Sequence, residues 1–315
     1  MFWYTLRRIA YVLPILFGVS IVCFSFVHLA PGDPMSAVMP EFASPELIAQ
    51  IKQAYGFDQP LPIQYFRWLG AVLSGDLGVS IISARPVWGE LLPAIRNTAQ
   101  LAIIGIGISL LLGIGLGVLA AYTRRFATDR AITTAAILGV SVPHYWVGMV
   151  LVAIFAVTLG LLPAMGMAPP DKSGFGLDDL RFMVLPALTL AMIPTAIIAR
   201  SVRATVMDVR KQEFVQTLYA NGLRRRRIFL HVIKNAAPSV LAILGLQIAQ
   251  LLGGSILVET VFAWPGTGYL LNNAIATRDL PLLQGTILVL AFFFVMMNFL
   301  VDLVQPFLDP RIKRQ

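Results

Sequence analysis

The sequence predicts an all-α protein that crosses a lipid bilayer several times. Hydrophobic residues make up 57% of its 315 residues, charged residues make up only 13%, and the mean hydropathy is +0.78. Soluble globular proteins are roughly 45–50% apolar and about 25% charged. So little charge cannot cover a surface that faces water, so most of the exterior must face lipid. A disulfide-rich secreted protein is excluded as well, because Cys23 is the only cysteine.

Six uncharged stretches are long enough to cross the membrane, since a helix of about 20 apolar residues spans the hydrocarbon core. They cover residues 9–32, 97–123, 131–170, 182–199, 235–258 and 280–301. We therefore expect six transmembrane helices, at residues 9–30, 97–123, 131–162, 182–201, 235–258 and 280–303. The third stretch contains Pro143, Gly160 and Pro163. It has room for two spans, but a seventh span would place the termini on opposite sides.

The first apolar stretch follows Arg7 and Arg8, as it would in a secretory signal peptide. The apolar core of a signal peptide has about 7–15 residues and ends at a small-residue cleavage site. This stretch is longer and ends in Ala30-Pro31-Gly32 without such a site. We therefore expect an uncleaved first helix.

The basic residues predict that both termini are cytoplasmic. Seventeen of the 24 Lys and Arg residues fall within residues 1–8, 123–130, 200–234 and 304–315. Cytoplasmic loops carry the excess of Lys and Arg in membrane proteins. We assign 1–8, 202–234 and 304–315 to the cytoplasm and 31–96, 163–181 and 259–279 to the outside, with one membrane domain over 97–304. The net charge of +8 is thus an orientation signal and does not indicate nucleic-acid binding.

The second expected span carries a row of small residues at four-residue spacing. The row consists of Gly105, Ser109, Gly113, Gly117 and Ala121. Small residues allow helix backbones to approach closely in lipid. The row predicts close helix packing, either inside one subunit or at a seam between subunits or a moving contact.

Polar residues in the last two spans are candidates for a translocation pathway. Gln247, Gln250 and Gly254 share one face of the fifth span, and Asn298 lies one turn before Asp302 in the sixth. Uncharged polar groups in a bilayer face the bundle interior or a wet cavity. The glutamines could line a pathway or form hydrogen bonds between helices, and both alternatives stay open. Asp302 fits an interfacial carboxylate better than a proton carrier.

No pattern predicts catalysis or metal binding. The three histidines, His28, His144 and His231, lack metal-ligand spacing, and no nucleotide-binding, hydrolase or metalloprotease motif is present. An energy-coupled function would therefore need an ATPase from another chain. An integral membrane enzyme has no support, and a stand-alone secondary transporter or channel lacks the expected intramembrane charges.

The cytoplasmic segment 212–222 predicts a short amphipathic helix. Phe214, Val215, Leu218 and Tyr219 form an apolar face, and Gly222 follows as a stop. Flanking charges, including Arg224, hold this segment off the membrane. We expect another protein to cover the apolar face.

Together these features resemble the permease subunit of a bacterial binding-protein-dependent ABC importer, in the branch that transports dipeptides, oligopeptides, nickel and glutathione. The similarity runs nearly end to end. It is carried by Pro31-Gly32-Asp33-Pro34, Tyr55-Gly56-Phe57-Asp58, Gly75-Asp76-Leu77-Gly78, Ser141-Val142-Pro143, Glu259-Thr260-Val261-Phe262-Ala263-Trp264-Pro265-Gly266 and Asp309-Pro310-Arg311-Ile312.

The resemblance implies that the 202–234 loop contains a coupling helix seated in a groove of the ATPase. The EAA motif of the family falls on Gln216-Thr217-Leu218, which departs from the generic residues, and its glycine falls on Gly222. The proline after Asn235 is Pro238, one place earlier than in the family pattern. The implied coupling residues are Glu213, Phe214, Gln216, Thr217, Leu218, Ala220, Gly222 and Arg224.

The resemblance also implies the partners and the cargo. A second homologous permease would complete the pathway, and one or two ABC ATPase subunits would bind ATP and Mg. An extracytoplasmic substrate-binding protein would dock on 31–96 and 259–279, with Asp58, Asp76, Glu259 and Trp264 as candidate contacts. Membrane lipid is a further partner, and no cofactor is expected in this chain. Peptides are the expected cargo; nickel chelates, glutathione and opine-like compounds are alternatives. The implied location is the bacterial inner membrane.

Overall fold

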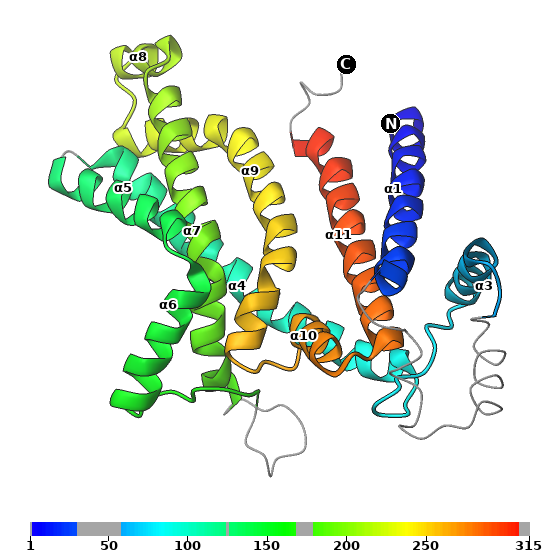
Figure 1. The fold of residues 1–315 in the computed structure, drawn as a ribbon. Coiled ribbons are helices and arrows are strands. Elements are labelled where there is room, and N and C mark those ends of the chain that lie inside the picture. The colour runs from blue at the N-terminus through cyan, green and yellow to red at the C-terminus, as the bar shows by residue number, and fades with distance from the viewer. Residues whose placement is uncertain (1, 30–57, 124–125, 168–178, 309–315) are drawn as a thin grey trace. The chain divides into compact units, whose positions relative to one another are not determined.

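The computed structural model describes residues 2–29, 58–123, 126–167 and 179–308. Within these residues the chain is helical, with one isolated antiparallel bridge between Val79 and Pro86 and no strand (Figure 1). This confirms the all-α prediction. The helices are α1 (Phe2–Leu29), α3 (Leu61–Leu73), α4 (Val87–Tyr122), α5 (Phe126–Ser141), α6 (His144–Leu151), η2 (Val152–Thr158), α7 (Leu180–Arg210), α8 (Glu213–Ala220), α9 (Arg225–Val261), α10 (Thr267–Thr277) and α11 (Leu280–Leu308).

Several sequence motifs lie outside the described residues. They include the motifs at 31–34 and 309–312 and most of 55–58, as well as residues 168–178 of the expected outer loop.

Four described helices are long and apolar enough to cross a membrane. They lie at Val87–Tyr122, Leu180–Arg210, Arg225–Ile248 and Leu280–Leu300. A fifth span results if α5 and the α6–η2 helix count as one broken span, and the apolar part of α1, Ala10–Ser25, is shorter. The protein is therefore a multi-pass membrane protein with four or five such spans among its described residues.

The expected third span, 131–162, is divided into two helices. The helix axes on either side of the break, Arg130–Ser141 and His144–Thr158, differ in direction by 102°. Pro143 occupies the N-cap of α6 with φ −58° and ψ 120°. Proline lacks an N–H and pushes the preceding residue out of helical geometry, so the helix ends before it and a new one begins after it. A straight span over 131–162 is thus ruled out.

Most of the expected spans are parts of longer helices, and the extensions of α4, α7 and α9 are the longest. α4 begins at Val87 rather than at residue 97, α7 continues to Arg210 rather than ending at 201, and α9 begins at Arg225 rather than at 235. Hydropathy marks only the part of a helix that contacts hydrocarbon. Helical hydrogen bonds continue into the polar flanks, where charged side chains are solvated.

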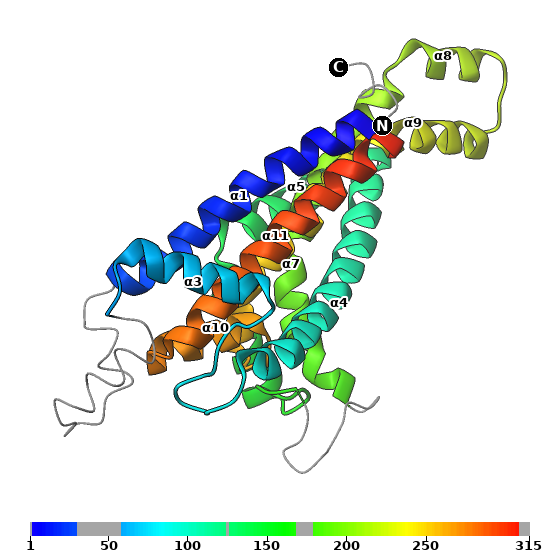
Figure 2. The same cartoon turned by 90° about the vertical axis from the view of Figure 1, so that its right-hand side faces the viewer.

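The chain divides into two compact units, which are described separately. The first comprises residues 1–97 and 266–296. In it, α1 packs against α3 (Figure 2). The Tyr65 hydroxyl lies 2.8 Å from Ser20 Oγ, and the Tyr65 ring contacts Phe24. A separate core joins the start of α4 to α10 and α11 through Val87, Leu91, Ala274 and Leu282.

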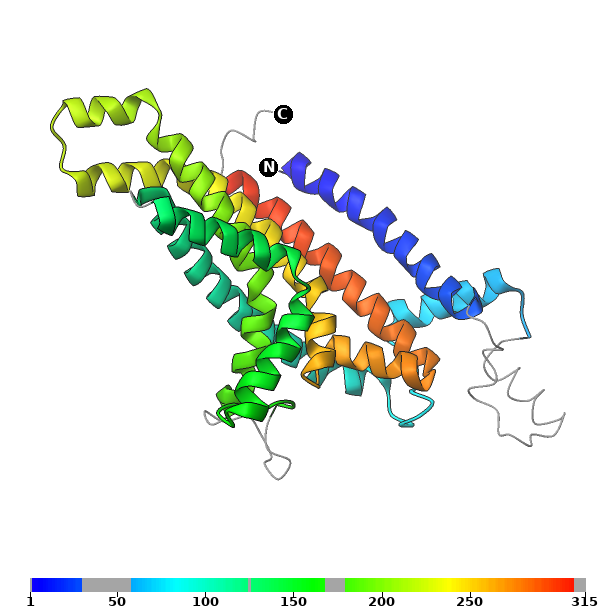
Figure 3. The same ribbon diagram turned by 60° about the vertical axis from the view of Figure 1, so that its left-hand side comes forward.

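The second unit comprises residues 98–265 and 297–315. α7 is its centre and packs against α5, α6 and α9 (Figure 3). Two apolar cores lie along it. One is built around Leu185, Leu190, Phe262 and Trp264, and the other around Ile198, Val206, Val215 and Val232.

The row of small residues on α4 packs against α7 within the same chain. A Cβ atom at Gly113 would lie 2.8 Å from the Ile198 side chain, and one at Gly117 would lie 2.6 Å from the Ala199 carbonyl oxygen. Real Cβ atoms do not approach other heavy atoms so closely. Of the two alternatives for this row, packing inside one subunit is therefore confirmed.

Candidate coupling and transport sites

The short helix α8 occupies the segment expected to couple transport to an ATPase. Gln212 precedes it in an extended conformation, and Glu213 places a carboxylate in its first turn, where the helix dipole favours negative charge. The helix ends in a Schellman motif. Gly222 N–H donates to Tyr219 O at 3.0 Å, and Leu223 N–H donates to Leu218 O at 3.2 Å. Gly222 has φ +70°, so the expected glycine stop is present.

The chain itself covers most of the apolar face of α8. Val215 is 3% exposed, and Phe214, Leu218 and Leu223 pack against the core around Ile198 and Val232. Of the four residues of that face, only Tyr219 is left exposed for another protein to cover, so the expectation that a partner must cover the whole face is wrong. The hydrophobic pattern cannot distinguish a face that docks on a partner from one that docks on the chain's own helix ends.

The residues of α8 that remain available to a partner are mostly polar. Glu213, Gln216, Thr217, Tyr219 and Ala220 are exposed, and Tyr219 is 55% exposed. Thr217 Oγ1 donates to the Glu213 carbonyl oxygen at 3.1 Å. After the helix, Gly222 and Arg224 are exposed as well. A docking protein would thus contact Gln216, Thr217 and Ala220. Phe214 and Leu218 pack into the core and would support the helix from its other side.

α8 is supported by the ends of three long helices. Val206 and Val209 of α7 and Ile228 and Val232 of α9 are buried in the same core as Val215. An Arg210 guanidinium N–H donates to the carbonyl oxygen of Ala121, which ties the end of α7 to the end of α4. A displacement of α8 would therefore be transmitted to membrane-spanning helices through packed side chains.

The glutamines expected on a pathway interact with each other along α9. Gln247 Nε2 lies 3.2 Å from Gln250 Oε1, within one helix face. Gln247 is 7% exposed, and its Oε1 is buried with no hydrogen-bond partner among the described residues, whereas Gln250 is exposed. Gly254 continues the same helix, and Asn298 is half-buried on α11.

Two of the four expected docking residues are buried. Glu259 and Trp264 are each 0% exposed. Thr98 Oγ1 donates to Glu259 Oε1 at 2.9 Å, and Trp264 N–H donates to the Glu259 carbonyl oxygen at 2.8 Å. Neither side chain can contact a docked protein in this structure, which corrects that expectation. They fix the turn after α9 instead.

The other two docking candidates lie in exposed turns of the first unit. Asp58 is exposed, and its Oδ2 accepts a hydrogen bond from Gln59 at 3.0 Å. Asp76 Oδ1 accepts one from Gly78 N–H at 2.8 Å and stabilises the turn after α3. Both carboxylates are accessible to a partner.

Asp279 was not identified from the sequence. It is 1% exposed, Ser80 Oγ donates to its Oδ2, and the backbone N–H of Leu282 lies within 3.3 Å of its Oδ1. It thereby ties the 78–86 loop to the start of α11. The Asp and Ser are far apart in sequence, so spacing alone gives no sign of the contact.

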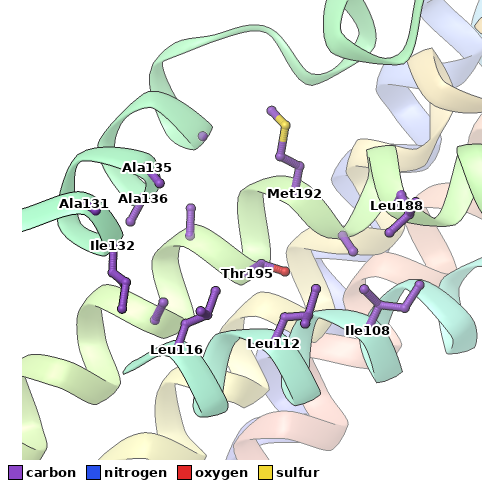
Figure 4. Close-up of a pocket in the computed structure, with 14 residues that line it drawn as sticks. Ile108, Leu112, Leu116, Ala131, Ile132, Ala135, Ala136, Leu188, Met192 and Thr195 are labelled. Atoms are coloured by element: carbon purple, nitrogen blue, oxygen red, sulfur yellow. The ribbon is translucent and has the colours of Figure 1, made fainter. Parts of the chain in front are cut away.

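An apolar cavity of about 480 Å³ lies between α4, α5 and α7 (Figure 4). Its walls include Ile108 and Leu116 of α4, Ile132 of α5 and Met192 of α7, and Thr195 supplies the one polar side chain of its lining. A peptide bond buried here would lose its hydrogen bonds to water without replacement. The cavity is therefore unsuited to a polar cargo. Its lining also includes none of the expected pathway residues.

Comparisons with known proteins agree with this helical membrane fold. Residues 113–314 match the family described as "Binding-protein-dependent transport system inner membrane component", and residues 1–102 match its N-terminal companion. The chain belongs to this family and is a multi-pass inner-membrane protein of binding-protein-dependent transport.

The relatives share the full length of the chain. It is 36% identical to the dipeptide transport system permease protein DppB of Alkalihalophilus pseudofirmus, over 98% of this chain and 99% of the relative. The corresponding Escherichia coli protein is 35% identical over 100% of both chains. A putative peptide transport system permease of Brucella abortus is 38% identical over 98% of both.

A solved structure shows the same fold. The MetNI methionine ABC transporter, in an inward-facing conformation, aligns with a TM-score of 0.54 at 16% identity, over 69% of this chain and 95% of the other. This likeness establishes an ABC permease fold.

Proposed function

We propose that this protein is the permease subunit of an ATP-driven peptide importer and forms half of its translocation pathway. The observation that carries the proposal is α8, a short helix with a polar exposed face that packs on the ends of α4, α7 and α9. The full-length similarity to permeases named for dipeptide transport supports peptide as the cargo. The chain itself is then a channel component and not an enzyme.

In the proposed assembly, six spans place both termini in the cytoplasm. Partner ATPase subunits bind ATP and Mg and contact Gln216, Thr217 and Ala220 of α8. A second, homologous permease supplies the other half of the pathway, and an extracytoplasmic binding protein delivers the cargo to the outer regions that include Asp58 and Asp76. The basic loop around α8 and the positive-inside rule support this orientation.

Gln247 and Gln250 are proposed to line the pathway near its centre. The buried Gln247 Oε1 has no partner among the described residues, and an unsatisfied amide oxygen in a membrane protein is costly. Its partner would be pathway water, cargo or the second permease. Gly254 and Asn298 remain weaker candidates for the same surface.

Reconstitution of the complete transporter tests the function and the cargo together. The complex with its binding protein is placed in lipid nanodiscs, and ATP hydrolysis is measured with di- and tripeptides, glutathione or a nickel chelate. We expect only the di- and tripeptides with ordinary α-peptide bonds to stimulate hydrolysis. If glutathione or the nickel chelate alone stimulates hydrolysis, that compound is the cargo instead of peptides. Uptake without the ATPase would refute the proposal that the transporter is ATP-driven.

A further inference from the structure

A second cavity, of about 520 Å³, lies between α8 and the helix ends that support it. Its polar lining comes from Tyr122 of α4, Arg210 of α7, Tyr219 of α8, and Arg225 and Arg226 of α9. The volume falls within the roughly 300–1,000 Å³ of ligand pockets. None of the coupling or transport roles proposed above uses this cavity.

The charge of the cavity favours an anion. Arg210, Arg225 and Arg226 place three guanidinium groups around it, and none of the residues that line it is acidic. Like charges brought together without a carboxylate create a positive potential that an anion would offset. Guanidinium groups bind phosphate through paired N–H donors, which a single ammonium group cannot match.

Two of the lining side chains are held in place before any ligand binds. Arg210 donates one N–H to the Ala121 carbonyl oxygen, and its guanidinium carbon lies 4.4 Å from the centre of the Tyr122 ring. The Tyr122 ring in turn packs against Phe229, with 5.2 Å between ring centres. A guanidinium has five donors, so its bond to Ala121 leaves capacity for a ligand.

The Tyr122 hydroxyl provides an independent sign of a missing ligand. Its oxygen is buried and has no hydrogen-bond partner among the described residues. Buried hydroxyl groups nearly always have a partner, because leaving one unsatisfied costs free energy. A ligand oxygen in the cavity would supply that partner after displacing the atoms that cover the hydroxyl.

The position of the cavity indicates where the anion comes from. The helices that contain three of the candidate membrane spans end at Tyr122 and Arg210 and begin at Arg225, in the polar flanks beyond their apolar stretches. Long Tyr and Arg side chains that flank a span can reach back toward the lipid headgroups. Val232 and Phe229 add an apolar wall beside the arginines. A phospholipid presents the same combination of phosphate and hydrocarbon.

We propose that this cavity binds the phosphodiester headgroup of an anionic phospholipid from the cytoplasmic leaflet, such as phosphatidylglycerol. The assignment to that leaflet rests on the orientation proposed above. The phosphate would contact Arg210, Arg225 and Arg226 and accept a hydrogen bond from the Tyr122 hydroxyl. The bound lipid would fasten the support of α8 to the membrane surface.

Native mass spectrometry of the detergent-purified full chain, titrated with phosphatidylglycerol or phosphatidylcholine, tests this site. The double variant Arg225→Gln/Arg226→Gln should weaken phosphatidylglycerol binding about a hundredfold, because each guanidinium that contacts the phosphate supplies charge-assisted hydrogen bonds worth roughly a factor of ten. Tyr122→Phe, which removes only the hydroxyl, should weaken it several-fold. Phosphatidylcholine should bind weakly to every form.

The matched control is Arg224→Gln/Arg227→Gln, which removes the same charge from the same run. All four arginines of the run are exposed, but Arg224 and Arg227 do not line the cavity, so this variant should bind nearly as the natural chain does. Equal losses in both double variants would show attraction to bulk charge and refute the site. If millimolar inorganic phosphate displaces the lipid, the cavity is a site for a free anion and not for a lipid. If Arg225→Gln/Arg226→Gln binds the lipid unchanged in this titration but no longer retains the ATPase when the complete complex is purified, the cavity would instead bind an acidic group of that partner.

Discussion

Gly222 ends α8 because its backbone adopts φ +70°, which residues with a Cβ reach only with strain. The two hydrogen bonds of the Schellman motif depend on this conformation, and they direct the chain toward Arg224 and α9. A Cβ atom at Gly222 would meet nothing within 4 Å. Any effect of substitution therefore comes from the backbone and not from a steric clash.

Gly222→Val is expected to reduce peptide uptake while leaving the protein in the membrane. A β-branched residue in the left-handed region costs about 1–2 kcal/mol, which favours a different end of α8. Gly222→Asn should retain most activity, because asparagine tolerates this conformation. Uptake per ATP hydrolysed in the reconstituted complex is the measurement. Equal coupling in the Val and natural forms would contradict the role of the turn.

Individual residues differ in how far the sequence predicts them. The sequence predicts the glycine after α8 because its role is local. The left-handed αL conformation at a helix end strongly favours glycine. Glu259 and Trp264 belong to a specific motif, yet burial removes them from the surface where docking was expected. Burial depends on contacts between distant segments, such as that between Thr98 and Glu259, which spacing does not show.

At the scale of elements, the contact between α4 and α7 depends on two glycines that permit close backbone approach. Gly117→Ala should destabilise the protein by about 1–3 kcal/mol, because its Cβ would lie 2.6 Å from the Ala199 carbonyl oxygen, which belongs to the backbone and cannot rotate away. Gly113→Ala should act in the same direction through Ile198. The midpoint of thermal unfolding in detergent measures the effect.

Gly107→Ala and Gly115→Ala are the matched controls on the same helix. A Cβ atom at either position would meet nothing within 4 Å. Alanine is the better helix former, so these variants should be neutral or slightly stabilising. If all four variants shift the midpoint alike, helix propensity and not packing against α7 determines the result.

The elements themselves follow largely from hydrophobic length and helix-end signals. Uncharged stretches located α4, α7, α9 and α11, and the pattern at 212–222 located α8. Direction is less predictable. The 102° bend at Pro143 is a consequence of proline chemistry, but Pro186 and Pro194 stay inside the continuous helix α7. Neighbouring helices decide whether a membrane helix tolerates a proline.

At the scale of the whole molecule, the distribution of charge predicts which side of the membrane each loop faces. The basic residues around α8 predict that it lies in the cytoplasm, and the 31–96 region, which has fewer basic than acidic residues, is predicted to lie outside. Positions in exposed loops can report this directly. Gln216 on α8 is exposed, and Ile82 in the loop before α4 is 63% exposed.

Single cysteines at these positions test the orientation in a Cys23→Ala background, which removes the one native thiol. Gln216→Cys should react with a membrane-impermeant maleimide only in inside-out vesicles, and Ile82→Cys only in right-side-out vesicles. Val215→Cys, next to Gln216 but 3% exposed, should react in neither.

In the intact complex, the cysteine at 216 should also cross-link to the ATPase, whereas the one at 215 should not. Labelling of position 216 from outside would reverse the topology, and with it the proposed coupling role of α8. Equal cross-linking from 215 and 216 would show that α8 leaves its core, since only an unpacked helix exposes both side chains.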